Sequence, residues 1–144
     1  MVAYADTSFL VSLYGRDPNS APAQQMAAVL KVPLALTPLL RHEARNAVRL
    51  AVFRKEITAV ERQSVLAALE ADAQAGALAD TPLTWADVYT EAETLSANHT
   101  EQLGTRGSDV LHVAAALALS VKEFYTFDTR QKALATAAGL KVKP

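Results

Sequence analysis

The chain has 144 residues, of which 51% are apolar and 20% charged, with a formal net charge of -1 and no cysteine. This composition predicts one globular domain over residues 1–144, and it excludes disulfides, thiolate nucleophiles and cysteine-ligated zinc sites. Because the net charge is close to zero, it provides no general attraction to nucleic acid, and any such site must be local.

The N-terminal residues lack a basic stretch followed by a long apolar run, so we expect no signal peptide. The longest strongly apolar stretch covers residues 113–119 and is too short to cross a bilayer. These two features predict a cytoplasmic protein that does not bind or span a membrane.

The first half of the chain alternates short apolar runs with amphipathic segments. Asp6 ends the first apolar run and can cap the helix that follows, and Thr37 with Pro38 is a strong helix start. Thr58 and Glu61 have the spacing of a capping box. The expected strands cover residues 2–5, 32–36 and, weakly, 77–81. The expected helices cover residues 9–14 after a cap within residues 6–8, 20–30 with Ser20 as cap, 38–53 and 58–75.

The second half contains the most apolar helix. Thr84 begins a helix in which Trp85 and Tyr89 are expected to pack in the core or in an interface. Ser108 is the expected cap of a helix that is apolar nearly all round and should therefore be central and buried. The expected helices cover residues 84–95, 109–120 and 129–138, the last ending at Gly139, and the expected strands cover residues 123–127 and 140–142.

Short strands separated by helices indicate a parallel sheet with crossover connections. We therefore expect an α/β fold in three layers, α/β/α, with a central and mostly parallel sheet of four to five strands.

Four acids occupy places that meet in such a fold. Asp6 and Asp128 follow the ends of two strands, Asp109 lies in the first turn of the buried helix, and Glu43 lies one to two turns into the helix after the second strand. These places converge on the crevice outside the carboxyl ends of parallel strands. Acids gathered there repel one another unless a cation lies between them.

Magnesium or manganese would suit such a site, because both prefer oxygen ligands. A bound dication can activate water, and a second one can stabilise the leaving oxygen of a displacement at phosphorus. The four acids therefore predict a site that cleaves phosphodiesters.

Each acid also has an ordinary interpretation. An aspartate after a strand is often only a helix cap, and Glu43 alone would be a solvated helix residue. The conjunction of all four favours a functional site, whereas four other acids lie in the middle of helices on faces expected to be solvated: Glu70, Asp72, Glu91 and Glu93.

The acids lie in segments that resemble the PIN-domain nucleases, and most closely the VapC-type toxins of bacterial toxin–antitoxin pairs. The similarity covers nearly the whole chain, in the order of the family, and rests on residues 6–10 (DTSFL), 43–47 (EARNA), 106–116 (RGSDVLHVAAA) and 126–131 (TFDTRQ). The resemblance implies a PIN-like fold and a Mg²⁺- or Mn²⁺-dependent endoribonuclease. It also implies a cognate antitoxin that blocks the site, and a homodimer.

The resemblance assigns roles to individual positions. Thr7 or Ser8 matches a hydroxyl position near the site, and Asn46 matches a polar position one turn beyond the glutamate. Where some relatives carry a further acid, this chain has His112 and Thr129, which implies weak binding of a second metal before substrate arrives. The positions that match the four catalytic and metal-binding acids are Asp6, Glu43, Asp109 and Asp128.

Several cationic side chains lie near these acids. Arg41, Arg45 and Arg49 form a stripe on one helix, which either contacts phosphate at the rim of the site or pairs with local acids. Arg106 and Arg130 flank two of the acids and are the stronger candidates for RNA contact, together with Arg45 from the stripe. For His112, a metal or general-base role is open, but a hydrogen-bonded core histidine is favoured.

Two other functions compete with the ribonuclease. One is a catalytically silent PIN-fold module that binds RNA or protein. The other is a different aspartate-based phosphoryl-transfer domain: a haloacid-dehalogenase-like phosphatase would need aspartate where Ser8 stands, and a receiver would need a paired acid and a late lysine that are missing.

Overall fold

The computed structural model describes residues 1–144 and contains five short strands whose pairings are all parallel. The strands form a three-stranded sheet of order β1-β4-β5 and a two-stranded sheet β2-β3, and one parallel bridge between Ala3 and Leu34 connects them. The expected number and direction of strands are confirmed, although the ladder is divided in two rather than continuous. The strands are β1 (Tyr4–Ala5), β2 (Leu34–Leu36), β3 (Leu78–Asp80), β4 (Glu123–Tyr125) and β5 (Lys141–Lys143).

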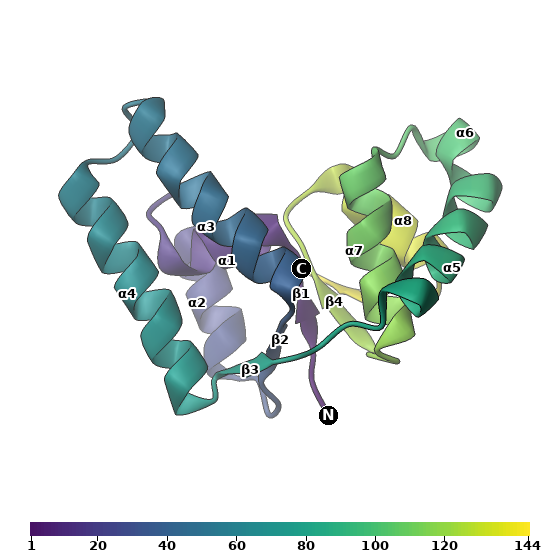
Figure 1. Cartoon of the computed structure of the whole chain (residues 1–144), viewed down its shortest axis with the longest axis horizontal. Coiled ribbons are helices and arrows are strands. Elements are labelled where there is room, and N and C mark those ends of the chain that lie inside the picture. Colours follow the sequence, from purple (N-terminus) through teal and green to yellow (C-terminus); the bar gives the residue numbers. More distant parts are fainter.

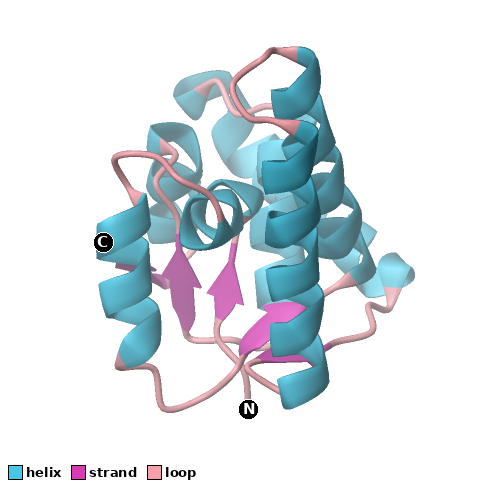
Figure 2. Ribbon diagram, turned by 90° about the vertical axis from the view of Figure 1, so that its left-hand side faces the viewer, coloured by secondary structure: helices cyan, strands magenta, loops and turns pink.

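Helices lie on both sides of the strands (Figure 2). In Figure 1, α1 to α4 lie to the left of the strands and α5 to α8 lie mostly to the right, so the first and second halves of the chain form separate flanks. The helices are α1 (Thr7–Tyr14), α2 (Ser20–Ala28), α3 (Pro38–Phe53), α4 (Ala59–Ala75), α5 (Trp85–Leu95), α6 (Glu101–Leu103), α7 (Gly107–Ala118) and α8 (Thr129–Ala137), with a π-helical turn η1 (Ser96–Thr100) before α6. The π-helical turn and α6 were not expected from the sequence.

Most helices begin where the capping chemistry predicts. Asp6 accepts a hydrogen bond from the backbone N–H of Phe9 at 2.9 Å, and Thr37 accepts one from Leu40 at 3.1 Å. The capping box of Thr58 and Glu61 is complete. These side chains remove unpaired N–H groups at the helix starts, which is why the bounds of α3 and α4 agree with the expected ones.

Two expected caps are wrong. The hydroxyl of Ser20 donates to the carbonyl of Gly15 and accepts from the N–H of Asp17, so it stabilises the turn before α2 rather than the helix start. Ser108 lies inside α7, which begins two residues earlier than expected. The reason is that the Asp109 carboxylate, in the third helical position, accepts from the backbone N–H of Arg106 at 3.0 Å and so supplies the cap.

The hydrophobic core is one cluster that includes β1, β4 and the inner face of α7. Val110, Val113 and the alanines at 114–116 are buried, as expected for a central helix. Trp85 and Tyr89 are 39% and 59% exposed, so the expectation of core packing is wrong for both. Helix α5 instead buries Val88, Ala92 and Leu95, because those residues lie on its face toward α7.

No helix is both long enough and apolar enough to cross a bilayer.

Candidate active site

The four acids predicted to act together lie on four different elements. Asp6 follows β1 and caps α1, and Asp128 follows β4 and caps α8. Asp109 lies in the first turn of α7, and Glu43 lies in α3. In Figure 1, α3 and α7 rise on either side of β1 and β4, the neighbouring parallel strands that Asp6 and Asp128 follow.

Asp6 is fully buried and is surrounded by donors. Its Oδ1 accepts hydrogen bonds from Ser8 Oγ at 2.7 Å and from the N–H of Phe9 at 2.9 Å, and its Oδ2 accepts from Thr126 Oγ1. Burial raises the pKa of Asp6 above its ordinary value, because a charged carboxylate loses hydration there, and the hydrogen bonds only partly oppose this. Asp6 is therefore a buried carboxylate to which no cationic side chain donates a hydrogen bond.

Asp109 and Asp128 share one cation. The guanidinium of Arg106 donates to Asp109 from Nε at 3.2 Å and from Nη2 at 3.4 Å, and Nη2 lies 3.7 Å from Oδ2 of Asp128. Arg106 is exposed, whereas Asp109 is buried. Arg106, one of the residues expected to contact RNA, thus pairs with two of the acids.

Glu43 is held from the other side of the site. His112 Nε2 lies 2.8 Å and 3.0 Å from its two carboxylate oxygens, and Thr7 Oγ1 donates to Oε2 at 3.2 Å. Desolvation alone would raise the pKa of the Glu43 carboxyl group, but the hydrogen bonds from His112 and Thr7 and the electrostatic influence of His112 and His42 together lower it below its ordinary value. His112 is buried and also bonded to Tyr4, so the favoured view of it as a hydrogen-bonded core histidine agrees with the structure.

Hydrogen bonds, one ion pair and neighbouring backbone positions link the acids into one network. Thr126 donates to Asp6 and accepts from the backbone N–H of Asp128 at 2.9 Å, and Arg106 pairs with both Asp128 and Asp109. Glu43 accepts from Thr7, which follows Asp6 directly in the sequence. Both hydroxyls that the family resemblance suggested therefore contact acids, Ser8 binding Asp6 and Thr7 binding Glu43.

The remaining residues expected near the site lie apart from this network. Asn46 is exposed and makes no side-chain hydrogen bond within the chain. Arg45 is partly buried and Arg130 exposed, and the side chain of neither forms an ion pair. Their guanidinium groups are therefore available to an anion.

For Arg41, the choice between phosphate contact and pairing with local acids is decided by its ion pairs. Its Nη1 lies 2.6 Å from Glu70 and its Nη2 2.5 Å from Asp80, so it pairs with local acids and joins α3 to α4 and β3. Two acids assigned to a solvated surface also have partners, since Glu70 binds Arg41 and Asp72 accepts from the hydroxyl of Tyr14 at 2.6 Å.

The donor chemistry suits a hard dication, but the side chains do not form a ready cage. No group of three or more histidine, aspartate or glutamate side chains is close enough to hold a metal ion. Mg²⁺ keeps several waters and usually takes one or two protein carboxylates, so it needs no such cage. Asp6 and Asp109 supply the carboxylate oxygens that such an ion prefers. Asp6 has no ion-pair partner, and the partner of Asp109, Arg106, is exposed.

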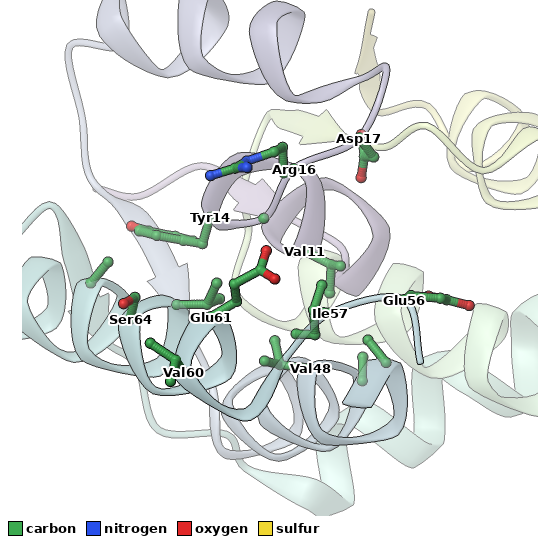
Figure 3. A pocket seen from close by; sticks show the side chains of 15 residues that line it. Val11, Tyr14, Arg16, Asp17, Val48, Glu56, Ile57, Val60, Glu61 and Ser64 are labelled. Carbon is green, nitrogen blue, oxygen red and sulfur yellow. The ribbon is translucent and has the colours of Figure 1, made fainter. Parts of the chain in front are cut away.

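A hollow of about 500 Å³ lies elsewhere. It is formed by α1, α3 and α4, and none of the four acids lines it (Figure 3). Val48, Ile57 and Val60 are among its apolar lining residues, and Arg16 and Glu61 are among its polar ones. Because it lacks a convergent set of catalytic groups, the acid network remains the better candidate for chemistry.

Three site features were not predicted from the sequence: the hydrogen bonds of the Thr126 hydroxyl, the ion pairs of Arg106 with Asp109 and Asp128, and the contact of Tyr4 with His112. Thr126 stands two residues before Asp128 at a strand end, and that placement is the only local signal it offers. The other two depend on side-chain direction.

The fold and the site together define a class of protein. The PIN domain family matches residues 3–137, and the chain therefore belongs to the PIN domain family.

Among solved structures, the chain is similar to VapC20 of Mycobacterium tuberculosis, described as a sarcin-ricin loop cleaving toxin, with a TM-score of 0.70, 21% identity and 99% of both chains covered. It is also similar to a structure of VapBC-1 from nontypeable Haemophilus influenzae, with a TM-score of 0.62, 14% identity, and 99% of this chain and 97% of that chain covered. A comparison with curated proteins gives no match.

Proposed function

We propose that the chain is a cytoplasmic Mg²⁺- or Mn²⁺-dependent endoribonuclease, the toxin of a toxin–antitoxin pair whose cognate antitoxin blocks the site. The observation that carries the proposal is the set of contacts among the acids, in a chain of the PIN family. Thr126 joins Asp6 to the backbone of Asp128, Arg106 pairs with Asp128 and Asp109, and Glu43 accepts from Thr7, the residue after Asp6. The similarity to a VapBC structure supports the antitoxin partner, and a homodimer follows from the resemblance to the family.

The acids have distinct parts in this proposal. Asp6 and Asp109 are the principal metal ligands, and Glu43 and Asp128 complete the site directly or through water. A bound dication would supply an activated water and neutralise charge at the phosphate. Ser8 and Thr126 hold the Asp6 carboxylate in one orientation, because each hydroxyl donates to a different oxygen.

The substrate is held by cations outside the acid network. Arg45 and Arg130 are accessible and have no acidic partner, so their guanidinium groups can bind RNA phosphates without breaking an existing ion pair. Arg106 can add a third phosphate contact once its two acids bind a metal. The near-neutral net charge makes this local set the main source of attraction for RNA.

The test is cleavage of end-labelled RNA by the purified chain with Mg²⁺ or Mn²⁺, and with EDTA as the metal-free control. The sarcin–ricin loop, the target named for VapC20, belongs among the RNAs tested. Asp6→Asn and Asp109→Asn should lose most activity, whereas Asp87→Asn, at an exposed position of α5, should not. Variants of Asp6 and Asp109 that cut as fast as the parent would refute the assigned roles.

Mapping RNA cut sites after induced expression of the chain would identify the target, and co-expression of a short neighbouring gene should suppress both cutting and growth arrest. The same cleavage assay distinguishes the enzyme from a catalytically silent PIN-fold module, which would bind RNA without product under every divalent metal.

A further inference from the structure

Three side chains from different elements form a hydrogen-bonded series, in which Tyr4 and His112 are buried and Glu43 is partly exposed. The Tyr4 hydroxyl lies 2.8 Å from Nδ1 of His112, and Nε2 of the same ring lies 2.8 Å and 3.0 Å from the oxygens of Glu43. Tyr4 is on β1, His112 on α7 and Glu43 on α3. These three side chains therefore connect α3 and α7, the helices on either side of β1 and β4 in Figure 1.

The hydrogen-bond chemistry defines the direction of this series. An ionised carboxylate can only accept, so Nε2 of His112 must carry a proton and donate to Glu43. In a neutral ring, Nδ1 is then the acceptor and the Tyr4 hydroxyl donates to it. Burial, together with the nearby carboxylates of Asp6 and Glu43, raises the pKa of Tyr4, so its phenol stays protonated and able to donate.

Tyr4 is itself immobilised. Its side chain is fully buried, and its ring stacks on Phe124 with centroids 5.4 Å apart. The hydroxyl therefore has little freedom, and it orients the His112 ring, which is 1% exposed. A rigid donor that reaches both oxygens of one carboxylate restricts the rotamer of that carboxylate.

We propose that His112, oriented by Tyr4, is a positioning residue that holds the Glu43 carboxylate toward the metal site, an inference that rests on the proposed function. His112 follows Asp109 by three residues on α7, and Glu43 comes from α3 on the other side of the site. The hydrogen bonds from His112 to Glu43 thus fix the position of Glu43 on α3 relative to Asp109 on α7.

Two substitutions of similar polarity separate positioning from packing. The amide of glutamine extends about as far as Nε2 of histidine and can donate to Glu43, whereas the shorter amide of asparagine reaches only the position of Nδ1. His112→Asn should weaken Mn²⁺ binding, measured by calorimetry, by about 10–100-fold, the usual effect of losing a partner that orients a metal ligand. His112→Gln should bind Mn²⁺ nearly as well as the parent. A purely structural role for His112 predicts losses of thermal stability that follow the volume removed, with no difference in Mn²⁺ affinity between the two variants.

Tyr4→Phe provides a variant that keeps the stacked ring and removes only the hydroxyl. Nitrogen NMR of the metal-free parent should show His112 protonated at Nε2, and Tyr4→Phe should shift the Nδ1 signal and reduce Mn²⁺ affinity. An unprotonated Nε2 in the parent would overturn the inference even if His112→Asn does not fold. A parent that binds Mn²⁺ and variants of equal affinity would overturn this inference alone, whereas a parent that binds no Mn²⁺ would overturn the proposed function and the inference with it.

Discussion

The guanidinium of Arg106 lies against the carboxylate of Asp109, with Nε 3.2 Å from Oδ2. The same group reaches Asp128 at 3.7 Å, so one side-chain cation stands between two acids of the site. Clustered carboxylates favour a positive charge nearby, and Arg106 supplies one. Under the proposed function, a dication would compete with Arg106 for the oxygens of Asp109 and Asp128.

Removing this cation should strengthen metal binding. We expect Arg106→Gln to bind Mn²⁺ several-fold more tightly than the parent, because the oxygens of Asp109 and Asp128 no longer have to exchange a guanidinium for the metal. Calorimetry at low ionic strength measures the affinity. Arg130→Gln is the matched control, since that side chain contacts no acid. Equal or weaker Mn²⁺ binding by Arg106→Gln would show that the two cations do not compete.

Asp6 should make the stability of the metal-free protein depend on pH. Its pKa is raised in the fold, so its contribution to stability is fully present below the ordinary aspartate pKa of about 4 and is lost as pH rises through the folded value. Asparagine has no such dependence. The parent should therefore lose stability relative to Asp6→Asn as the pH rises from about 3 to about 7. The unfolding free energy of the variant minus that of the parent should increase over this range.

Urea denaturation in EDTA measures this difference, with Asp87→Asn, at an exposed position, as the control. A difference that decreases with pH would mean that the donors around Asp6 outweigh its burial.

Local chemistry explains which parts of the fold were predictable. Helices α3 and α4 start where Thr37 and Thr58 cap them, and a cap involves only residues three apart. The start of α7 was misjudged because Asp109, at the third helical position, does the capping that was assigned to Ser108. Exposure of Trp85 depends on which face of α5 meets α7, and helical spacing alone does not give that face.

The same distinction applies to the site. The acids could be found from their places after strands and in first helical turns, since those places are fixed by the parallel topology. Their partners could not, because Tyr4 and His112 are 108 positions apart and Asp6 and Thr126 are 120 apart. Such contacts depend on packing between flanks that the chain order does not reveal.

Arg41 and Arg45, four residues apart on α3, should behave differently when replaced by glutamine. Arg41→Gln should lower the unfolding free energy by up to about 1 kcal/mol, because Arg41 joins Glu70 and Asp80 in a partly exposed pair of ion pairs. Arg45→Gln should leave stability unchanged and weaken RNA binding, lowering the magnitude of its salt dependence by about one. Thermal unfolding and binding titrations at several salt concentrations distinguish the two, and a loss of RNA affinity from Arg41→Gln alone would contradict these assignments.

Thr126 should matter for both folding and cleavage, because its hydroxyl serves two acids at once. It donates to Oδ2 of Asp6 and accepts from the backbone N–H of Asp128, and it is buried. Thr126→Val keeps the shape of the side chain but leaves both groups without that partner, so we expect a loss of about 1–3 kcal/mol in unfolding free energy. Cleavage should fall more than stability alone explains, because Asp6 loses one of the donors that fix its orientation. Thr126→Ser keeps the hydroxyl and should retain most of the stability and activity in denaturation and RNA cleavage assays. A serine variant as impaired as the valine variant would show that the hydroxyl alone does not account for the role of Thr126.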